Sequence, residues 1–318
     1  TEINSIVIDI KDYSGFILYN LDSKYFENFK TKEVRIKNLN ALIRYLHSKN
    51  IYVIVRQTIF QDPILAETLK EHALYSSIAE NGQKILWRDK KGLAWIDPYS
   101  KEVWEYNFEI TRDLFTRAVD EVNYDYIRFP TDGNLDMAKY PFYDKSGLTK
   151  EQVITSFFKA MRTKFPNNLL SADIFGQTLI SNDDLGIGQK FIIASEYFDF
   201  VSPMIYPSHF GQGFMGYKNP EIYPYEVIEY SLKEALNKIK KSLLINNLSA
   251  TSSINNSQSD SNSNIIRAKI RPWLQNFSIS TEYSEKDIMD QILATEETLK
   301  NSDYYNGWML WDPTNVYN

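Results

Sequence analysis

Short apolar runs, separated by longer and more polar stretches, recur along this chain of 318 residues. Most of the runs are rich in β-branched and aromatic residues, a composition that favours buried strands. Seven strands are predicted in this way, over residues 5–10, 51–56, 122–129, 169–175, 199–206, 266–274 and 307–311.

The stretches between the strands carry apolar residues at helical spacing. In residues 34–49, Ile36, Leu39, Ile43 and Leu46 recur every three or four positions. Similar patterns predict helices over residues 101–119, 150–165, 224–243 and 284–300, with Ser100 as an N-cap and Thr149 and Gln152 as a capping box. Strands that alternate with helices predict an α/β fold with a parallel sheet.

The ends of the predicted strands favour a closed barrel over an open sheet. All but one place a charged or amide side chain near the C-terminal end, and strand 199–206 has Ser202 and Tyr206 there. An open, doubly wound sheet gathers its ligand groups at one crevice, whereas a barrel has a ring of loops. We therefore predict a (β/α)8 TIM barrel that lacks its first strand, which we expect before Thr1.

One barrel domain is expected to span residues 1–318, because α/β barrels routinely exceed the average domain length. Within it, thirteen of the nineteen residues in 246–264 are Ser or Asn. Such a low-complexity segment cannot bury enough apolar surface to order itself. We predict that it is an insertion remote from the chemistry.

Composition narrows the classes of ligand. The 22 Tyr, 18 Phe and 6 Trp residues suit a large core and also sugar-binding clefts, whereas a net charge of −6 leaves no basic footprint for nucleic acid. No apolar run is long enough to span a membrane. The chain has no Cys, its three histidines lack metal-ligand spacing, and it has no dinucleotide-binding glycine motif, so we expect neither a metal nor a cofactor.

Residues 121–133 carry the strongest candidate chemistry. Asp125 lies inside an apolar strand and Arg128 lies at its end, just before Pro130. A buried carboxylate is unfavourable unless it is paired or faces a wet pocket. The C-terminal end of a barrel strand is where active sites lie. The alternative is a purely structural ion pair between Asp125 and Arg128.

Other strand ends repeat this pattern. Asp173 lies late in the strand over residues 169–175, and Asp9 and Lys11 share one face of the first strand by its period of two. His209 follows the strand over residues 199–206, where it either faces a ligand or makes a local hydrogen bond. Residues 84–97 indicate a hairpin whose Trp87 and Trp95 either pack on the barrel rim or form a sugar platform.

These segments resemble, in the same order, the motifs of a bacterial family of putative glycosyl hydrolase domains, barrels that are distantly similar to α-amylases. The resemblance spans nearly the whole chain and is carried by residues 7–12, 95–104, 124–133, 171–176, 202–209, 271–275 and 307–311. It implies a strand and a helix before the first motif, and hydrolysis of an O-glycosyl bond in a poly- or oligosaccharide. The Ser/Asn segment departs from the family pattern. Members are commonly exported or associated with the cell envelope.

Glycoside hydrolysis needs two carboxyl groups about the scissile bond. By resemblance to amylase-type barrels, the strand of Asp125 carries the nucleophile. We predict Asp125 as nucleophile or oxocarbenium stabiliser, with Arg128 or another basic group holding its pKa low, and Asp173 as general acid among apolar neighbours. The predicted sugar-binding residues are Asp9, Lys11, Arg56, Asp97, Arg128, Tyr206, His209 and Gln275, with Trp273 and Trp311 stacking on a pyranose ring.

Two other interpretations stay open. A catalytically inactive glycan-binding barrel would have its carboxylates more than about 10 Å apart or its pocket blocked by side chains. A phosphosugar enzyme ranks last, because Asp312, Pro313 and Thr314 offer no glycine-rich phosphate cradle after the last strand. The expected partner is a carbohydrate, and the protein is expected to be a monomer.

Overall fold

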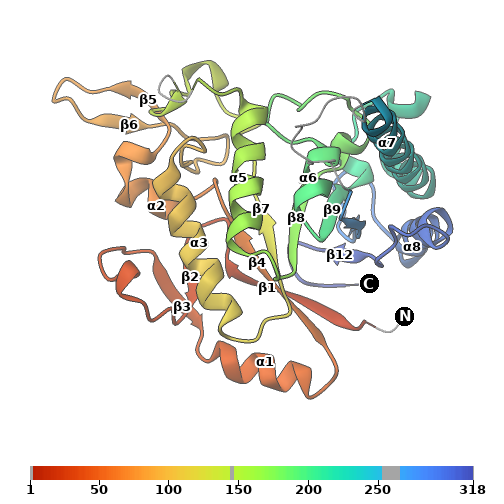
Figure 1. The fold of residues 1–318 in the computed structure, drawn as a ribbon, viewed down its shortest axis with the longest axis horizontal. Coiled ribbons are helices and arrows are strands. Elements are labelled where there is room, and N and C mark those ends of the chain that lie inside the picture. Colours follow the sequence, from red (N-terminus) through yellow and green to blue (C-terminus); the bar gives the residue numbers. More distant parts are fainter. Residues whose placement is uncertain (1–2, 144–146, 253–265, 318) are drawn as a thin grey trace. The chain divides into compact units, whose positions relative to one another are not determined.

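The computed structural model describes residues 3–143, 147–252 and 266–317. The chain is a mixed α/β protein in which most strand pairs are parallel (Figure 1). Its contacts divide it into two compact units. Unit 1 contains Thr1–Ser171 and Gly186–Gly188, and unit 2 contains Ala172–Leu185 and Gln189–Asn318. The chain passes from the first unit to the second inside strand β8 (Leu170–Phe175).

Unit 1 is built on three parallel strands. These are β1 (Ser5–Lys11), β4 (Tyr52–Thr58) and β7 (Glu121–Asp125), which lie side by side in that order. The short strand β2 (Ile17–Tyr19) pairs antiparallel with the end of β1, and β3 (Lys32–Ile36) pairs parallel with β2. Because parallel strands present their C-terminal ends at one edge, the last residues of β1, β4 and β7 share an edge of the layer.

Among the described residues, unit 1 has the α-helices α1 (Leu39–His47), α2 (Pro63–Thr68), α3 (Lys101–Phe115) and α5 (Lys150–Lys164). Helices α3 and α5 run side by side (Figure 1), and Trp104 and Phe108 both contact Phe157, with ring centroids 5.4 and 5.6 Å apart. The predicted caps are confirmed. The Ser100 side chain caps α3, and Thr149 and Gln152 form the capping box of α5. A two-stranded hairpin, β5 (Tyr75–Ile78) and β6 (Lys84–Leu86), projects from the unit (Figure 1).

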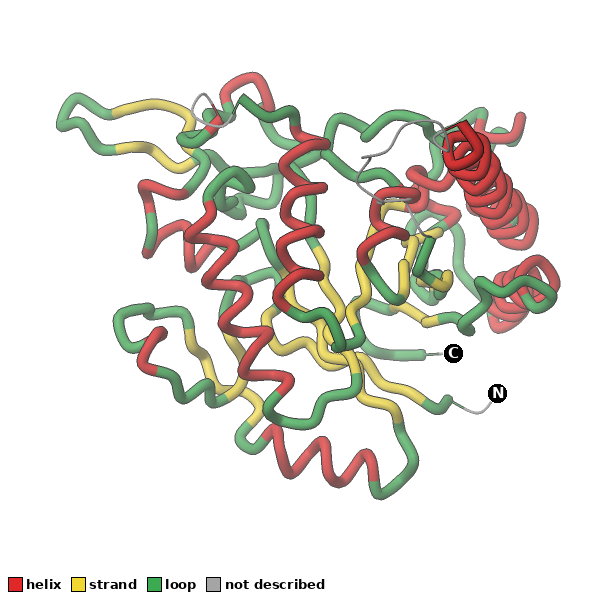
Figure 2. Tube along the Cα trace, viewed as in Figure 1, coloured by secondary structure: helices red, strands yellow, loops and turns green. Residues whose placement is uncertain are grey.

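Unit 2 contains the end of β8 and then β9 (Phe200–Ile205), β11 (Trp273–Gln275) and β12 (Met309–Trp311), in that order. The pairs β9–β11 and β11–β12 are parallel, and β10 (Lys269–Ile270) also pairs parallel with β9. Its helices are α6 (Phe191–Tyr197), α7 (Pro224–Ser252) and α8 (Glu285–Leu299) (Figure 2). Helices α7 and α8 pack together, and the Tyr225 hydroxyl on α7 donates to Glu297 on α8 at 2.7 Å.

All seven predicted strands are present, but two of them differ in extent or continuity from the prediction. Strand β7 stops at Asp125 rather than residue 129, because Tyr126 has a φ of 52°, a left-handed conformation that no strand continues. Residues 266–274 hold two short strands, β10 and β11, since Pro272 between them cannot donate to a ladder.

Other local predictions differ in detail. Residues 34–36 belong to β3 and not to a helix, because the Asn38 side chain caps α1 and the helix begins at Leu39. The predicted turn at residues 89–92 is confirmed, with Gly92 N–H donating to Asp89 O at 3.0 Å. The strand before that turn, β6, pairs mainly with β5. The sequence pattern did not reveal β5, β2 or α6.

The strand pairings inside each unit, among the residues described, close no ring, so the eight-stranded barrel stays a prediction, as does the single domain. Of the predicted insertion, residues 246–252 continue α7 and residues 253–264 lie outside the described residues. In the part of the chain that is described, no helix is both long and apolar enough to cross a bilayer.

Candidate active site

Three charged side chains meet at the C-terminal edge of the strands in unit 1. Arg56 on β4 lies directly opposite Asp9 on β1, and its Nη1 donates to Asp9 Oδ1 at 3.0 Å. The same guanidinium donates to Asp125 Oδ2 at the end of β7, from Nε at 3.2 Å and also from Nη2. Arg56 therefore bridges two carboxylates on the two strands that flank β4.

The two carboxylates of this cluster differ in exposure. Asp125 is 4% exposed, and its Oδ1 also accepts a hydrogen bond from Tyr126 N–H at 2.6 Å. The Asp9 side chain keeps 38% of its surface exposed. Burial raises the pKa of Asp9, Arg56 opposes that rise, and the nearby charge of Asp125 adds to it. Asp9 is thus the carboxylate of the pair that solvent or a ligand can reach.

Arg128 lies in the turn after β7 and packs against aromatic rings rather than forming the predicted pair with Asp125. Its guanidinium lies over the rings of Trp95 and Tyr126, at 5.2 and 5.0 Å from their centroids, and Nη1 donates to Phe129 O. The ion pair of Asp125 is with Arg56, so the alternative of a structural Asp125–Arg128 pair named the wrong partner. Trp87 and Trp95 are both buried and pack as core residues rather than as an open sugar platform.

Two residues predicted to bind sugar are internal in unit 1. Lys11 is fully buried, and its ammonium lies 2.7 Å from Asp62 Oδ2 and donates to Thr58 O at 2.7 Å. Asp97 is also fully buried and accepts from the backbone N–H groups of Tyr99 and Phe142 at 3.0 and 2.8 Å. Both side chains hold loops at the strand ends, which argues against the predicted sugar contacts.

Asp62 was not singled out from the sequence, although it is the partner of a buried lysine. Its Oδ1 caps helix α2 by accepting from Leu65 N–H at 2.9 Å. The signal that could have found it is the Asp62–Pro63 pair, since an Asp before a Pro is a common start of a helix.

The acid of unit 2, Asp173, is held by a tryptophan. The indole Nε1–H of Trp273 donates to Asp173 Oδ1 at 2.8 Å, and the two residues are 4% and 1% exposed. Trp311 meets the Trp273 ring edge-on, with centroids 5.9 Å apart and planes at 79°, and it is half-buried. Trp273 therefore offers no open face to a sugar ring, whereas Trp311 keeps part of its surface exposed.

The loop after β9 in unit 2 presents His209. This exposed imidazole touches the rings of Tyr206 and Phe277, at 5.1 and 5.9 Å between centroids, and partial burial lowers the pKa of His209. Gln275 is fully buried, and its Oε1 accepts from Ser208 N–H and Oγ–H at 3.1 and 2.9 Å. Gln275 thus holds this loop, which argues against its predicted contact with sugar.

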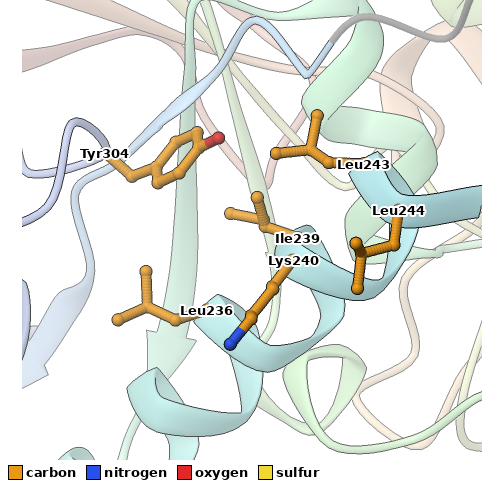
Figure 3. Close-up of a pocket in the computed structure, with 6 residues that line it drawn as sticks. All are labelled: Leu236, Ile239, Lys240, Leu243, Leu244 and Tyr304. Atoms are coloured by element: carbon orange, nitrogen blue, oxygen red, sulfur yellow. The ribbon is translucent and has the colours of Figure 1, made fainter. Parts of the chain in front are cut away.

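A separate pocket in unit 2, with a volume of ≈ 220 Å³, lies along α7 (Figure 3). Its walls are mostly apolar, and none of the predicted site residues lines it; the lining residues are Leu236, Ile239, Lys240, Leu243, Leu244 and Tyr304. Among the residues that the structure describes, no group of three or more His, Asp or Glu side chains could hold a metal ion.

Comparison with known proteins assigns the chain to a family. The model of the family described as "Putative glycosyl hydrolase domain" matches residues 1–317. The chain belongs to this family. The predicted resemblance is therefore confirmed over the whole chain, while no curated protein is similar enough to match.

Several solved structures are similar to this chain, and the first described here, at a TM-score above 0.5, shows a shared fold. The glycoside hydrolase domain of PgaB (BpsB) from Bordetella bronchiseptica is similar over 97% of this chain and 84% of that one, with 12% identity and a TM-score of 0.60. A hypothetical protein from Ruminiclostridium thermocellum is 31% identical over 58% of this chain and 86% of that one, with a TM-score of 0.48. The glycoside hydrolase domain of PelA from Pseudomonas aeruginosa is 10% identical over 87% and 85%, with a TM-score of 0.43.

Proposed function

We propose that this protein is a glycoside hydrolase that cleaves an O-glycosyl bond in a poly- or oligosaccharide. Asp125 acts as nucleophile or oxocarbenium stabiliser, and Asp173 acts as general acid. The observation that carries the proposal is the Asp9–Arg56–Asp125 cluster at the C-terminal edge of parallel strands, in a chain of a glycosyl hydrolase family. That edge is where α/β barrels place their catalytic groups.

Arg56 suits Asp125 to the role of a charged group. Hydrogen bonds from a guanidinium to a carboxylate are charge-assisted, and here two nitrogens of Arg56 donate to the same oxygen, Oδ2. The other oxygen, Oδ1, accepts from Tyr126 N–H. A nucleophile or an oxocarbenium stabiliser must carry its negative charge when the glycosidic bond breaks, and Arg56 places a cation beside Asp125.

The start of β8 supports the choice of Asp173 as the second acid. Within unit 1, Val122 N–H donates to Leu169 O at 3.2 Å, and the Asn123 amide donates to the Ser171 hydroxyl at 2.9 Å. Side chains on a strand alternate between faces, so Asp125 shares the face of Asn123 and Asp173 shares the face of Ser171. The contact between Asn123 and Ser171 therefore lies on the face of β7 that carries Asp125.

The remaining site residues divide into two groups in this proposal. Residues with exposed or partly exposed side chains would contact the sugar. Asp9 and His209 would form hydrogen bonds with the hydroxyl groups of the sugar, and Trp311 would stack on its ring. Arg56 and Arg128 would contact the sugar from unit 1, and Tyr206 would contact it from unit 2. Lys11, Asp97 and Gln275 would support the loops from within.

The test is turnover by Asp125→Asn and Asp173→Asn on a panel of oligosaccharides and aryl glycosides. Each change should lower kcat by about 10²–10⁴-fold, because it removes a charge or a proton that the reaction needs. Asp136→Asn, at an exposed position of unit 1, is the matched control and should keep wild-type turnover. Unchanged turnover in both active-site variants would remove these acids from catalysis.

A glycan-binding module without turnover is the second candidate. The low exposure of both acids, 4% for Asp125 and 1% for Asp173, favours it, since a catalytic acid must touch its substrate. A glycan array followed by product analysis separates the two functions. Retained glycans without released products would support the binding module, whereas released products would exclude it.

A further inference from the structure

Trp273 has a contact that its predicted role as a sugar platform does not explain. Its indole N–H points at one named oxygen of the proposed general acid, Asp173 Oδ1, at 2.8 Å. Both side chains are almost completely buried inside unit 2. An indole N–H is a donor only, so it fixes the carboxyl oxygen that it meets as an acceptor.

We propose that Trp273 is a positioning residue that selects which oxygen of Asp173 carries the catalytic proton. The inference rests on the proposed function and deepens it. In a neutral carboxyl group the carbonyl oxygen is the better acceptor and the hydroxyl oxygen is the donor. An indole held against Oδ1 therefore makes Oδ1 the carbonyl oxygen and leaves the proton on Oδ2.

The strands of unit 2 keep the indole in place. Trp273 pairs with Met204 of β9 on one side and with Met309 of β12 on the other, so its backbone lies inside the sheet. The ring of Trp311 packs edge-on against the Trp273 ring at 5.9 Å. On the side of the acid, the Gln189 amide donates to Asp173 O at 3.4 Å. Donor and acceptor are thus each fixed by groups of the same unit.

The contact also changes strength during the reaction. As the glycosidic bond breaks, the Oδ2–H bond breaks and its proton moves to the leaving oxygen, which also takes the electron pair of the C–O bond. Asp173 is left as a carboxylate. A hydrogen bond to a charged acceptor is stronger than one to a neutral acceptor, so the indole stabilises this carboxylate more than the starting acid. Only such differential stabilisation raises kcat.

Kinetics can distinguish a positioning role of Trp273 from a sugar-stacking role. Trp273→Phe keeps an aromatic ring in the core but removes the N–H, and it should lower kcat about tenfold with KM changed less than about twofold. Trp308→Phe is the matched control, because its indole contacts Glu296 at 3.4 Å and it has no part in the proposed site. A rise in KM with kcat unchanged in Trp273→Phe would show a sugar-stacking role and overturn the inference.

A spectroscopic test needs no activity. Trp273→Phe identifies the Trp273 indole signal in a ¹H–¹⁵N spectrum by its disappearance. In the otherwise unchanged chain, Asp173→Leu should move that signal upfield, because the acceptor oxygen is lost, and Asp199→Asn elsewhere in unit 2 should not. Sequential assignment identifies the signal if Trp273→Phe fails to fold, and a Trp273 signal that does not move in Asp173→Leu overturns the inference.

The outcomes separate this inference from the proposed function. If Asp173→Asn abolishes turnover while Trp273→Phe keeps kcat within about twofold of wild type, the positioning role fails and the hydrolase stands. If Asp173→Asn keeps full turnover, the general acid has been misassigned, so this inference and the role of Asp173 both fall while the hydrolase activity stands. Loss of turnover in the first variant with a tenfold loss in the second supports both.

Discussion

Asp125 and Asp97 are two buried carboxylates of unit 1 that have opposite kinds of partner. Asp125 accepts from the Arg56 guanidinium, whereas Asp97 accepts from two neutral backbone N–H groups, those of Tyr99 and Phe142. Burial raises the pKa of Asp97 to about 6, and the two N–H donors oppose that rise without cancelling it. Neutral donors are therefore enough to hold the buried acid Asp97 in place. Asp125, the acid that is proposed to react as a charged group, lies beside a cation instead.

A second ion pair of unit 1, between Lys11 and Asp62, is completely buried. Lys11 and Asp62 have no exposed side-chain surface, so each charge depends on the other. Lys11→Met would leave Asp62 as an uncompensated buried acid. We expect a loss of about 3–5 kcal/mol in the free energy of unfolding, measured by urea denaturation, which is the usual effect of breaking a buried pair.

Two further variants show whether the unpaired charge causes this loss. Arg35→Met breaks half-exposed pairs with Asp12 and Glu33, and it should change stability by less than about 1 kcal/mol. The double variant Lys11→Met with Asp62→Asn removes both charges, keeps an oxygen that can cap helix α2 and should recover most of the loss. A double variant as unstable as Lys11→Met would show that packing, and not charge, dominates at this position.

The next largest effect concerns Arg56 itself. Arg56→Met removes both guanidinium bonds from Asp125 and the one to Asp9, so the proposed nucleophile loses its cation. We expect kcat/KM to fall about 10²–10³-fold, comparable to the loss of an electrostatic donor in an active site. Arg56→Lys should lie between, because lysine keeps the charge but not the planar fork.

The control for Arg56 is Arg112→Met, on a half-exposed position of α3, which should keep wild-type turnover. Initial rates with the best substrate from the panel are the measurement. Full activity in Arg56→Met, with Asp125→Asn inactive, would mean that Asp125 works without its cation, and the comparison with Asp97 would lose its functional meaning.

The same residues show how far sequence alone could reach. Local patterns located Asp125 at the end of a buried strand, because an acid in an apolar run is visible without tertiary information. The pairing of Asp125 with Arg56 was not visible, since it depends on the register between β4 and β7, which are 69 residues apart at this contact. Pattern reasoning could therefore name the candidates but not their partners.

The prediction that Asp9 and Lys11 both reach the site from one face of β1 is wrong for a specific reason. A strand period of two places Asp9 and Lys11 on one face, yet the register with β4 shifts between these two residues. Such a bulge redirects the side chains that follow it. Asp9 reaches Arg56 near solvent, while Lys11 turns into the interior and meets Asp62. No feature of residues 5–12 announces the bulge.

The smallest expected effect, and the most direct test of the comparison, is the pH dependence that Asp97 brings. Its pKa is raised from 3.8 to about 6 in the folded chain, so between about pH 4 and 6 the folded state holds a proton that the unfolded state has lost. Stability should therefore fall as pH rises through this window, by about 2–3 kcal/mol at 1.36 kcal/mol per pKa unit.

Asp97→Asn cannot titrate. Its urea midpoint should be lower than wild type at pH 4, because the amide cannot accept from both N–H groups, and the gap should narrow towards pH 7. Asp136→Asn should keep the wild-type slope. Parallel wild-type and Asp97→Asn curves from pH 4 to 7 would mean that the backbone donors hold Asp97 charged throughout, and neutral donors would then be equal to a cation.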